Sequence, residues 1–463
     1  MPPDGRAEAG SGALEGRLGA AERRALDALD VTGLVDLLRT LIAVPSLDGH
    51  ESAAQRVVAS WCRDAGLDVD EWEVDLGALA SHPDWCHEVE RDEALGVVAS
   101  TGAAGSGRDL MLNGHIDVVP VGDEAAWTAP PFSPVLRDGR VYGRGSVDMK
   151  GGLCCALAAA RAVCDADVRL RGRLSVASVV GEEDGGTGTL ATLLRGHTAD
   201  GAVIAEPTRL RLVTAQAGSL MFRLTVTGLS AHACAREEGV SAVEKFVPLL
   251  AALRRLEAER CGAEPAGAIG PGGALAGARP SGAGASVAGE PHAPLFAGYR
   301  LPWPIEVGTL RAGDWASSVP DTLVAEGRYG VAVGEDVAAA RRALEDAVAR
   351  AAAADPWLAE HPPRVEWWGG RFDPAETPPD DPVAAAVSGA AGAVLGSPPA
   401  VEGVTYGADM RLLANTGGIP TVMFGPGDVR VAHMPDEFVP LDELEAAARV
   451  FVVAALRFCG VEE

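Results

Sequence analysis

A repeated unit limits the fold of this 463-residue chain more than any other feature. The unit is a short apolar run, then a polar or glycine-rich loop, then often a helical stretch, and it recurs at Asp109–Leu112, Arg140–Tyr142, Leu174–Val180 and Ala202–Ile204. Strands that alternate with helices predict a largely parallel sheet covered on both faces. Ligands of such sheets collect beyond the carboxyl ends of the strands. We therefore expect the polar residues that follow these runs to converge.

The pattern changes near residue 218. The run SLMFRLTVTG alternates like a half-buried antiparallel strand, and a helical stretch follows it. Strand-like runs resume at Ile305–Leu310 and Thr322–Val331, before an alanine-rich helix near Val337–Ala354. The αβ pattern then returns, with a strand predicted at Thr421–Phe424. This order predicts a second, α+β domain inserted into the first.

The domain boundaries follow from these changes of pattern. Residues 1–20 are rich in Gly, Ala, Pro and charge, and are predicted to be a disordered lead-in. The first domain is predicted to be discontinuous, with residues 21–217 and 374–463, and the inserted domain to comprise residues 218–373. Within the insert, residues 262–293 form a Gly/Ala/Pro-rich stretch that predicts an exposed loop or linker.

Charge and cysteine usage narrow the class of protein. Lys and Arg total 39 against 65 Asp and Glu, a formal charge of -26. This balance disfavours nucleic acid or an anionic membrane as a partner, but it leaves small carboxylate substrates open. Met1–Gly19 has no basic start and no apolar core of a signal peptide, and no apolar run reaches the roughly 20 residues of a membrane span. The eight cysteines show no CxxC pairing, so we expect a cytoplasmic protein with free thiols.

His115 and Asp117 are the first residues with metal-site chemistry. Their spacing lets one loop present an imidazole together with a carboxylate that orients it, as metal-binding histidines usually require. Alone, the pair is weak evidence, because a surface histidine beside a helix-capping aspartate is the commoner arrangement. The pair becomes stronger evidence for a metal site in combination with the loops that follow it in the sequence.

Asp148 lies in the glycine-rich loop GRGSVDMKGG, where glycines let the backbone turn tightly beside a ligand. Such a loop can instead cradle phosphate at a helix N-terminus. Against this alternative, the chain has neither a GxxxxGK[ST] motif nor a dinucleotide-binding GxGxxG with its acidic partner. A carboxylate among the glycines also suits a cation better than an anion.

Three further loops supply carboxylates and an imidazole. Glu182 and Glu183 are adjacent after an apolar strand, and they repel each other unless they are solvated or face a cation. A solvated acidic loop is the alternative. Because consecutive residues project differently, one can bind a metal while the other moves a proton. Glu206 in AEPT is by itself an ordinary helix-start signal, and His433 in AHMPDE by itself an ordinary histidine.

The order of the motifs resembles a known family. NGHIDVVP, WTAPPFSP, GRVYGRGSVDMKGG, GEEDGGTGT, AEPT, GLSAHA, GADMRLL and FGPGD…AHMPDE follow one another from about residue 34 to the C-terminus. This series resembles the co-catalytic zinc amidohydrolase and peptidase family of acetylornithine deacetylase, succinyl-diaminopimelate desuccinylase, aminoacylase and glutamate carboxypeptidase. The resemblance implies a phosphorylase/hydrolase-like α/β catalytic domain with an inserted ferredoxin-like α+β lid and dimerisation domain, and a homodimer formed through that lid.

The resemblance also implies a ligand set for two Zn2+ ions per chain, with Co2+ or Mn2+ able to occupy similar sites. Asp148 would bridge both metals. His115 and Glu206 would complete one metal site. Glu183 and His433 would complete the other.

The remaining roles carry over from the same family. Asp117 would orient His115, and Glu182 would be the general base. His232 in GLSAHA resembles a lid histidine that stabilises the oxyanion, in several relatives across the subunit boundary; a surface histidine at a strand end is the alternative. Arg411 in GADMRLL resembles an arginine that binds the substrate carboxylate, with Arg328 a weaker candidate for this task.

Two features depart from the family pattern. Many relatives carry Asn shortly before a Val-x-Pro or Ile-x-Pro turn, whereas this chain has Ser317 and Ser318 there, which puts that substrate contact in doubt. The stretch 262–293 is also longer than the resemblance predicts.

These residues predict a hydrolase of linear amides that uses a di-zinc-activated water. The resemblance associates Glu rather than Asp at position 206 with deacylases and carboxypeptidases instead of aminopeptidases and dipeptidases. The stretch PWPIEVGTL…DWASSVPDTL…EGR resembles N-acyl amino acid deacylases. We therefore expect a small N-acylated amino acid or peptide-like substrate with a free carboxylate. A metallo-carboxypeptidase of the same family is the runner-up. A non-catalytic metal-binding protein with the same fold is the rival from another class, and a plain α/β ligand-binding protein would hold no tightly bound metal.

Overall fold

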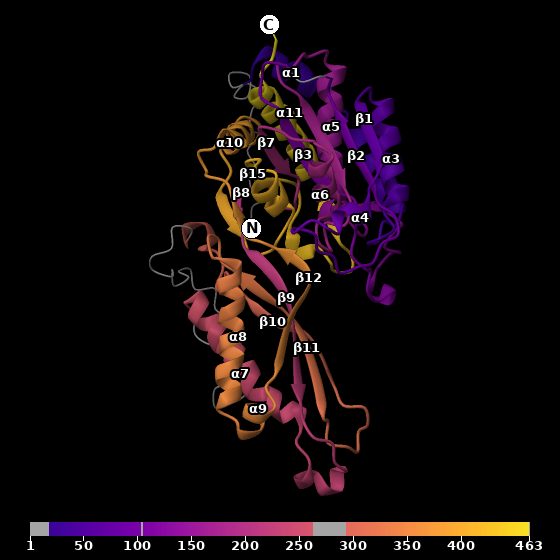
Figure 1. Cartoon of the computed structure of the whole chain (residues 1–463). Coiled ribbons are helices and arrows are strands. Elements are labelled where there is room, and N and C mark those ends of the chain that lie inside the picture. The colour runs from indigo at the N-terminus through magenta and orange to yellow at the C-terminus, as the bar shows by residue number, and fades with distance from the viewer. Residues whose placement is uncertain (1–17, 103–104, 263–292, 463) are drawn as a thin grey trace, which may run out of the picture. The chain divides into compact units, whose positions relative to one another are not determined.

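The computed structural model describes residues 18–102, 105–262 and 293–462, which form two compact units (Figure 1). The second unit comprises residues 215–375 and 402–411, and the first unit comprises the rest. The sequence-based insert, 218–373, does not contain the short segment 402–411. Nearly all of the predicted lead-in 1–20 and loop 262–293 lie outside the described residues, although the first helix begins at Ala20.

Eight helices and nine strands lie wholly within the described part of the first unit. The helices are α1 (Ala20–Asp27), α2 (Val31–Ala43), α3 (Ser52–Asp64), α4 (Leu76–Leu79), α5 (Gly151–Asp165), α6 (Thr187–Leu194), α10 (Pro382–Leu395) and α11 (Leu441–Cys459). The strands are β1 (Asp68–Glu73), β2 (Leu95–Ser100), β3 (Leu110–His115), β4 (Val135–Arg137), β5 (Arg140–Tyr142), β6 (Leu174–Val179), β7 (Gly201–Ile204), β15 (Thr421–Met423) and β16 (Phe438–Pro440). The boundaries with the second unit fall at β8 (Leu212–Gln216), β13 (Ala375–Glu376) and β14 (Val401–Val404).

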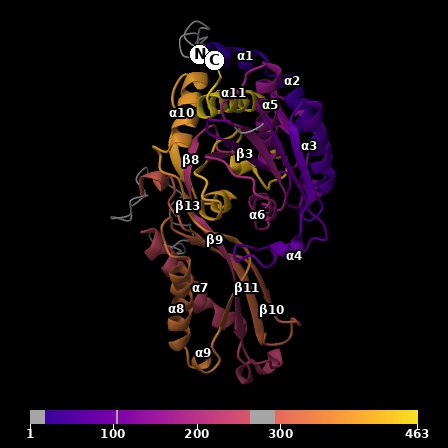
Figure 2. The same ribbon diagram turned by 45° about the horizontal axis from the view of Figure 1, so that its top comes forward.

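A mixed sheet forms the centre of the first unit, with the strand order β1-β2-β6-β3-β7-β15-β8-β13 and β14 paired to β8. The four strands β6, β3, β7 and β15 are parallel, while β1, β2 and β8 pair antiparallel. Every residue of these four parallel strands is buried, so both faces of the sheet are covered. Helix α5 contacts β3 and β6, and it also packs against α11, which lies beside α10 (Figure 2). The predicted α/β class is confirmed, although the sheet is mixed.

One predicted strand belongs elsewhere. Arg140–Tyr142 was expected to end at the same sheet edge as the others, but β5 pairs with β4 and β16 in a separate three-stranded antiparallel sheet. The two residues between β4 and β5, Asp138 and Gly139, have φ of 52° and 70°, as a tight type I′ hairpin turn requires. The Asp-Gly pair is a sequence signal for this hairpin, but three residues carry too little periodicity to show which sheet the hairpin joins.

The second unit confirms the expected ferredoxin-like arrangement. Its elements follow the chain as β9 (Gly218–Thr227), α7 (Ala242–Cys261), β10 (Ile305–Ala312), β11 (Thr322–Val331), α8 (Val337–Ala353), α9 (Pro356–Glu360) and β12 (Arg364–Phe372). The sheet order is β10-β11-β9-β12, and all pairs are antiparallel.

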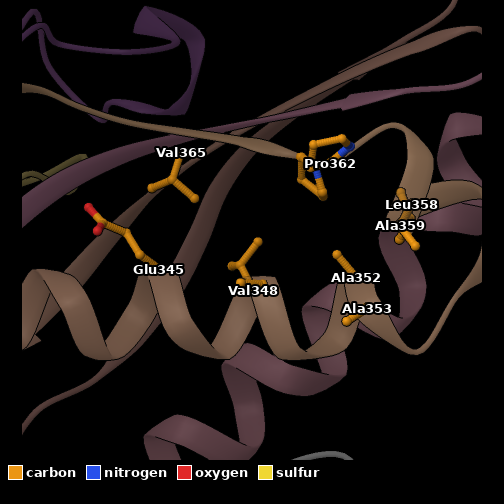
Figure 3. A pocket seen from close by; sticks show the side chains of 10 residues that line it. Glu345, Val348, Ala352, Ala353, Leu358, Ala359, Pro362 and Val365 are labelled. Atoms are coloured by element: carbon orange, nitrogen blue, oxygen red, sulfur yellow. The ribbon is translucent and has the colours of Figure 1, made fainter.

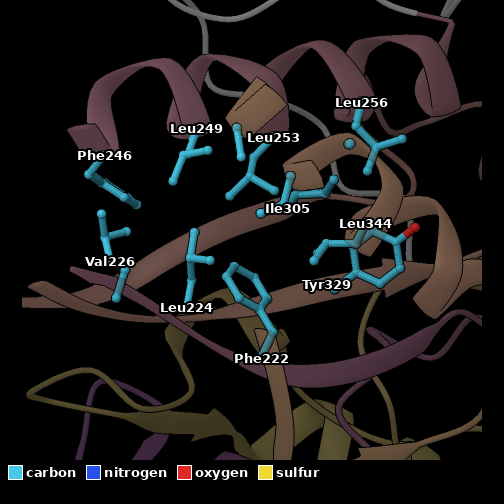
Figure 4. Close-up of a cluster of buried hydrophobic side chains, with 14 of the residues drawn as sticks. Phe222, Leu224, Val226, Phe246, Leu249, Leu253, Leu256, Ile305, Tyr329 and Leu344 are labelled. Atoms are coloured by element: carbon cyan, nitrogen blue, oxygen red, sulfur yellow. The ribbon is translucent and has the colours of Figure 1, made fainter. Parts of the chain in front are cut away.

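The core of the second unit lies between this sheet and the helices α7 and α8 (Figure 4). Side chains alternate along β9, so that Leu220, Phe222, Leu224 and Val226 face the core while the residues between them are partly exposed. Gly327 lies opposite Phe222 in β11, and a Cβ there would lie 2.7 Å from the Phe222 ring. The Phe222 ring thus occupies the space that a side chain at position 327 would need.

A separate hollow of about 430 Å³ opens between α8, α9 and the start of β12 (Figure 3). Apolar side chains such as Val348, Leu358 and Val365 line most of it, with the carboxylate of Glu345 at one end. The Nε1–H of Trp367 donates to this carboxylate at 2.8 Å. The hollow lies entirely within the second unit and contains none of the predicted site residues.

Leu249 and Val247 provide a test of the second unit's core, because both lie on α7 but only Leu249 is buried; Val247 is 61% exposed. Leu249→Ala should lower the free energy of unfolding by about 2–5 kcal/mol, since it removes buried methyl groups and leaves a cavity. Val247→Ala should change it by only about 0.5 kcal/mol. Urea denaturation, with hydrogen exchange of peptides from 218–262 as a local readout, measures both. Equal effects of the two substitutions would contradict this packing.

Candidate metal centre

His115 ends β3, and its imidazole is 1% exposed. Its Nδ1 lies 3.0 Å from the backbone oxygen of Asp117, which can only accept, so Nδ1 carries the proton of this bond. The Nε2 atom then faces the Asp148 carboxylate, 3.1 Å from Oδ1. A histidine held in this way presents Nε2 as the ligand atom, which is the arrangement that metal-binding imidazoles require.

Asp148 lies in the irregular turn Ser146–Lys150 that precedes α5. Its two carboxylate oxygens face two different histidines, because Oδ1 lies 3.1 Å from Nε2 of His115 and Oδ2 lies 3.4 Å from Nε2 of His433. Burial raises the pKa of Asp148, but the hydrogen bonds from the two histidines outweigh it and hold the pKa below its usual range. A carboxylate with one oxygen toward each imidazole has the orientation that a bridging ligand needs.

Glu182 and Glu183 follow β6 and point to different neighbours. The Oε1 atom of Glu183 lies 3.0 Å from Nε2 of His433, and its backbone N–H donates to Oδ2 of Asp117 at 3.0 Å. Glu182 instead brings a carboxylate oxygen within 4.8 Å of ligand atoms of His115 and Glu206. Asp117 therefore contacts His115 mainly through its backbone oxygen, since its carboxylate, which was predicted to orient His115, lies 3.7 Å from Nδ1. The bond of this carboxylate to the acidic loop was not indicated by the sequence.

Glu206 follows β7 and is 4% exposed. Two glycines let other segments approach the end of this strand, since a Cβ on Gly152 would lie 1.9 Å from the Ala205 oxygen and one on Gly425 would lie 2.5 Å from the Glu206 oxygen. Gly152 is the second residue of α5, and Gly425 lies two residues after the end of β15. The glycines thus allow α5, β7 and β15 to pack closely where Glu206 is presented.

His433 is about half exposed and has a φ of 60°, a left-handed conformation that residues other than glycine seldom adopt. Such backbone conformations persist where the surrounding structure imposes them, and they cluster at functional sites. Hydrogen bonds to Asp148 and Glu183 raise the pKa of His433 to about 10. Burial lowers the pKa of His115, but the charge of Asp117 and the hydrogen bond to Asp148 raise it well above its usual range.

The donor set fits two divalent cations. Two groups of ligand atoms, His115 with Glu182 and Glu206, and His115 with Asp148 and Glu183, each lie within 4.8 Å of one another. Mixed imidazole and carboxylate ligands suit zinc and neighbouring transition metals. The structure therefore brings together all five predicted metal ligands with Asp117 and Glu182. Which atom binds which ion stays a prediction.

Two residues that the sequence-based predictions do not include support Asp148. The Oε1 atom of Glu437 accepts the backbone N–H groups of Val147 and Asp148 at 2.9 and 3.2 Å, and its Oε2 atom accepts Nη1 of Arg144 at 2.6 Å. All of these groups are buried or nearly so. Glu437 is four residues after His433 in AHMPDE, and Arg144 is part of GRGSVDMKGG. Both supporting residues therefore belong to motifs that the sequence had already indicated.

The other predicted residues belong to the second unit. His232 is exposed, and its Nδ1 accepts the backbone N–H of Cys234 at 3.1 Å. Arg328 donates to Ser219 Oγ at 2.7 Å and to the backbone oxygen of Thr405. Arg411 is 2% exposed, with its guanidinium 5.6 Å from the centre of the Phe372 ring. Their roles toward a substrate stay predictions.

Comparison with known proteins decides the family. The model of peptidase family M20/M25/M40 matches residues 111–457. The chain belongs to this family. The match includes all five predicted ligands and most of both units, so the resemblance seen in the motifs is confirmed. M20/M25/M40 membership, together with relatives named as deformylases, makes the chain a hydrolase of amide C–N bonds outside rings.

Relatives of known name agree with this assignment. The chain is 26% identical over 448 residues to N-formyl-4-amino-5-aminomethyl-2-methylpyrimidine deformylase of Bacillus subtilis (strain 168), with 92% of this chain and 95% of the relative covered. It is 28% identical over 451 residues to the deformylase of the same name from Halalkalibacterium halodurans, with 93% and 95% covered. The M20 family metallo-carboxypeptidase Sso-CP2 of Sulfolobus solfataricus has the same fold, with a TM-score of 0.68, 16% identity, and 92% and 99% covered.

Other features of the chain bear on earlier expectations. The eight cysteines form no disulfide bond, as their spacing predicted. Within the part of the chain that the structure describes, no helix is both long and apolar enough to cross a membrane.

Metal binding should release protons from this site. Without metal, hydrogen bonds to Asp148 and Glu183 raise the pKa of His433 to about 10, whereas a ligating imidazole must be neutral. Zinc binding at pH 7.5 should therefore release about one proton per chain from His433, and this release should vanish as the pH rises through about 10. Calorimetric titration in buffers of different ionisation enthalpy measures this release. His433→Ala should release about one proton fewer, and heats that do not depend on the buffer would contradict the assignment.

Proposed function

We propose that this chain is a di-metal amidohydrolase that removes a small acyl group from an N-acylated amino acid. The observation that carries the proposal is the position of Asp148, whose two carboxylate oxygens face the imidazoles of His115 and His433. Glu183 lies on the His433 side, and Glu206 lies on the His115 side. This arrangement supports two adjacent metal sites that share one bridging carboxylate.

Family membership supports a metal at each position, since proteins of this family typically depend on a dinuclear centre. His115 and Glu206 would hold one ion, Glu183 and His433 the other, and Asp148 both. Two bound ions would lower the pKa of a shared water and polarise the amide carbonyl. We propose zinc as the ion, with cobalt or manganese as alternatives, because the ligands mix imidazole and carboxylate.

Glu182 is proposed as the general base. Its side chain is 6% exposed and lies beside His115 and Glu206, close to where the attacking water would be held. From this position a carboxylate can accept the proton of the attacking water and later deliver it to the leaving amine. Glu182 differs from Glu183 in its neighbours, which supports a division between a proton carrier and a ligand.

His232 is proposed to donate a hydrogen bond to the oxyanion of the tetrahedral intermediate. Because its Nδ1 accepts the N–H of Cys234, the neutral ring carries its proton on Nε2. An N–H donor is what a developing oxyanion requires. Dimerisation through the inserted domain, and action of His232 on a partner's site, rest on the family resemblance.

Arg411 is proposed to bind the carboxylate of the substrate. A planar guanidinium binds a carboxylate through two parallel hydrogen bonds, and the side chain is almost wholly buried in the second unit. Arg328 is the weaker candidate, because its Nε and Nη2 already donate to Ser219 and Thr405. Those bonds join β9 and β11 to the segment 402–411, which supports a structural role for Arg328.

A second candidate function follows from the named relatives. The two deformylases cover at least 92% of this chain, and their substrate, an N-formyl aminomethylpyrimidine, carries no carboxylate. Hydrolysis of an N-formyl or other N-acyl amine is thus the alternative substrate class. The metallo-carboxypeptidase alternative and a non-catalytic metal-binding protein are tested by the same assays.

Glu182→Gln tests the proposed base. The variant should still bind two zinc ions per chain, because Glu182 is not among the proposed ligands, but its kcat should fall by roughly 10²–10⁴-fold. Metal analysis of the purified protein and amide hydrolysis assays with and without a chelator measure both quantities. Full activity in this variant, or loss of a zinc ion from it, would contradict the proposed role. Wild-type protein with two zinc ions and no amidase activity would favour the non-catalytic alternative.

Arg411→Lys separates the two substrate classes. An ammonium group cannot reproduce the bidentate geometry of a guanidinium, so KM for N-acetyl and N-succinyl amino acids should rise by about tenfold or more. Rates with N-formyl amines that lack a carboxylate should stay unchanged. A panel of N-acyl amino acids, dipeptides and N-formyl amines measures this. Equal effects on substrates with and without a carboxylate would remove Arg411 from substrate binding.

A further inference from the structure

Arg91 lies between two buried carboxylates. Its Nη1 is 2.9 Å from Oε1 of Glu51, and its Nη2 is 3.0 Å from Oδ1 of Asp184; all three side chains are at most 2% exposed. Glu51 directly precedes α3, and Asp184 follows Glu183 in the chain. One guanidinium thus connects the start of a helix to the loop that carries the proposed base and a proposed ligand. Neither the motifs nor the proposed mechanism gives Arg91 a role.

The segment around Arg91 contacts this acidic loop at further points. The second carboxylate oxygen of Asp184 accepts the backbone N–H of Val89 at 3.2 Å. The thiol of Cys86 lies 3.6 Å from the backbone oxygen of Gly185. Residues 86–91 therefore hold Asp184 and Gly185 by backbone and side-chain contacts together, and Arg91 supplies the charged contact among them.

Gly181 shows that the loop is shaped to receive Arg91. Its φ is 62°, and a Cβ at this position would lie 2.4 Å from Nη2 of Arg91 and 2.8 Å from Oδ1 of Asp184. A residue larger than glycine would therefore displace the guanidinium as well as strain the turn. This close approach of Arg91 occurs at Gly181, where the loop begins just after β6.

The opposite side of the loop is held by Asp117, whose Oδ2 accepts the backbone N–H of Glu183 at 3.0 Å. Contacts with Asp117 and with Arg91 thus fix the backbone on both sides of Glu183. The side chain of Glu183 is then left directed at His433, at 3.0 Å. Its neighbour Glu182 lies next to His115 and Glu206.

We propose that Arg91 is a positioning residue for the metal centre. It acts through Asp184 to hold the loop so that Glu183 points toward one metal site and Glu182 toward the attacking water. The guanidinium is suited to this task because its rigid fork bonds two carboxylates in different directions, which the single ammonium of lysine does poorly. Groups that orient metal ligands typically change metal affinity or activity by 10–100-fold when they are removed.

The test compares Arg91→Gln and Arg91→Lys with Arg195→Gln. Arg195 donates two hydrogen bonds to Asp70 in the same unit, but that pair is exposed, so it controls for the loss of an ion pair. Three quantities are measured: hydrogen exchange of peptides covering 181–187 in metal-free protein, zinc affinity by competition with a chelator, and kcat with KM.

Arg91→Gln should speed exchange in the loop and weaken one of the two zinc ions by about tenfold or more. It should also lower kcat by about tenfold or more while KM changes less than threefold, since substrate contacts are unaffected. Arg91→Lys should recover part of each loss. Arg195→Gln should match wild type in all three. Unchanged loop exchange and zinc affinity in Arg91→Gln would overturn the proposal.

Should Arg91→Gln fail to fold, Arg91→Lys takes its place, because it keeps the buried charge but lacks the fork that bonds both carboxylates. The same pattern of losses supports the proposal, and wild-type loop exchange and zinc affinity overturn it. The inference rests on the proposed function, yet the two fail separately. Wild-type protein that binds no zinc contradicts the proposed function, whereas loop exchange in the metal-free variants still decides whether Arg91 holds the loop.

Discussion

The carboxylate of Asp148, placed between two imidazoles, is the contact on which the rest of the site depends. His115 comes from the central sheet and His433 from a loop more than three hundred residues later, and each faces one oxygen of Asp148. Without that carboxylate the two histidines would face Glu183 and Glu206 with no group between them to share. The glycines before Asp148 and the close approach of α5 serve to place this one side chain.

Buried negative charge is the constraint that follows. Asp148, Glu182, Glu183 and Glu206 gather in a region with little solvent, and like charges at such distances destabilise one another unless cations or hydrogen-bond donors compensate. The two histidines supply part of this compensation. Buried ion pairs around the centre compensate further negative charge. Arg144 pairs with Glu437, and Arg91 pairs with both Glu51 and Asp184. These ion pairs hold the loops in place, whereas the carboxylates and imidazoles at the centre are the candidate metal ligands.

Local patterns of apolar residues in the sequence predicted much of the fold. The strand predicted at Thr322–Val331 and the helix predicted near Val337–Ala354 occur with almost the same bounds, because alternation and helical periodicity report burial of neighbouring residues. The ferredoxin-like order of the second unit followed from the family resemblance, and the sheet confirms it. Arg140–Tyr142 was assigned to the wrong sheet, because it pairs with β4 through a local hairpin and with β16 from near the C-terminal end of the chain. Residue types and motif order likewise named the candidate ligands, which the structure brings together, but not the bonds that orient them.

The sequence by itself determined the chemistry of this protein: imidazoles and carboxylates at the ends of apolar runs, with glycines where the backbone must turn. Only the tertiary structure decided which atoms of these side chains lie in contact with one another. Glu437 reaches the backbone of Asp148 across 289 residues, and Arg91 reaches Asp184 across 93. Contacts of this length leave no periodic trace in the chain, because they depend on how loops from different strands meet. For that reason the candidate ligands could be named from the sequence, whereas the groups that hold them in place could not.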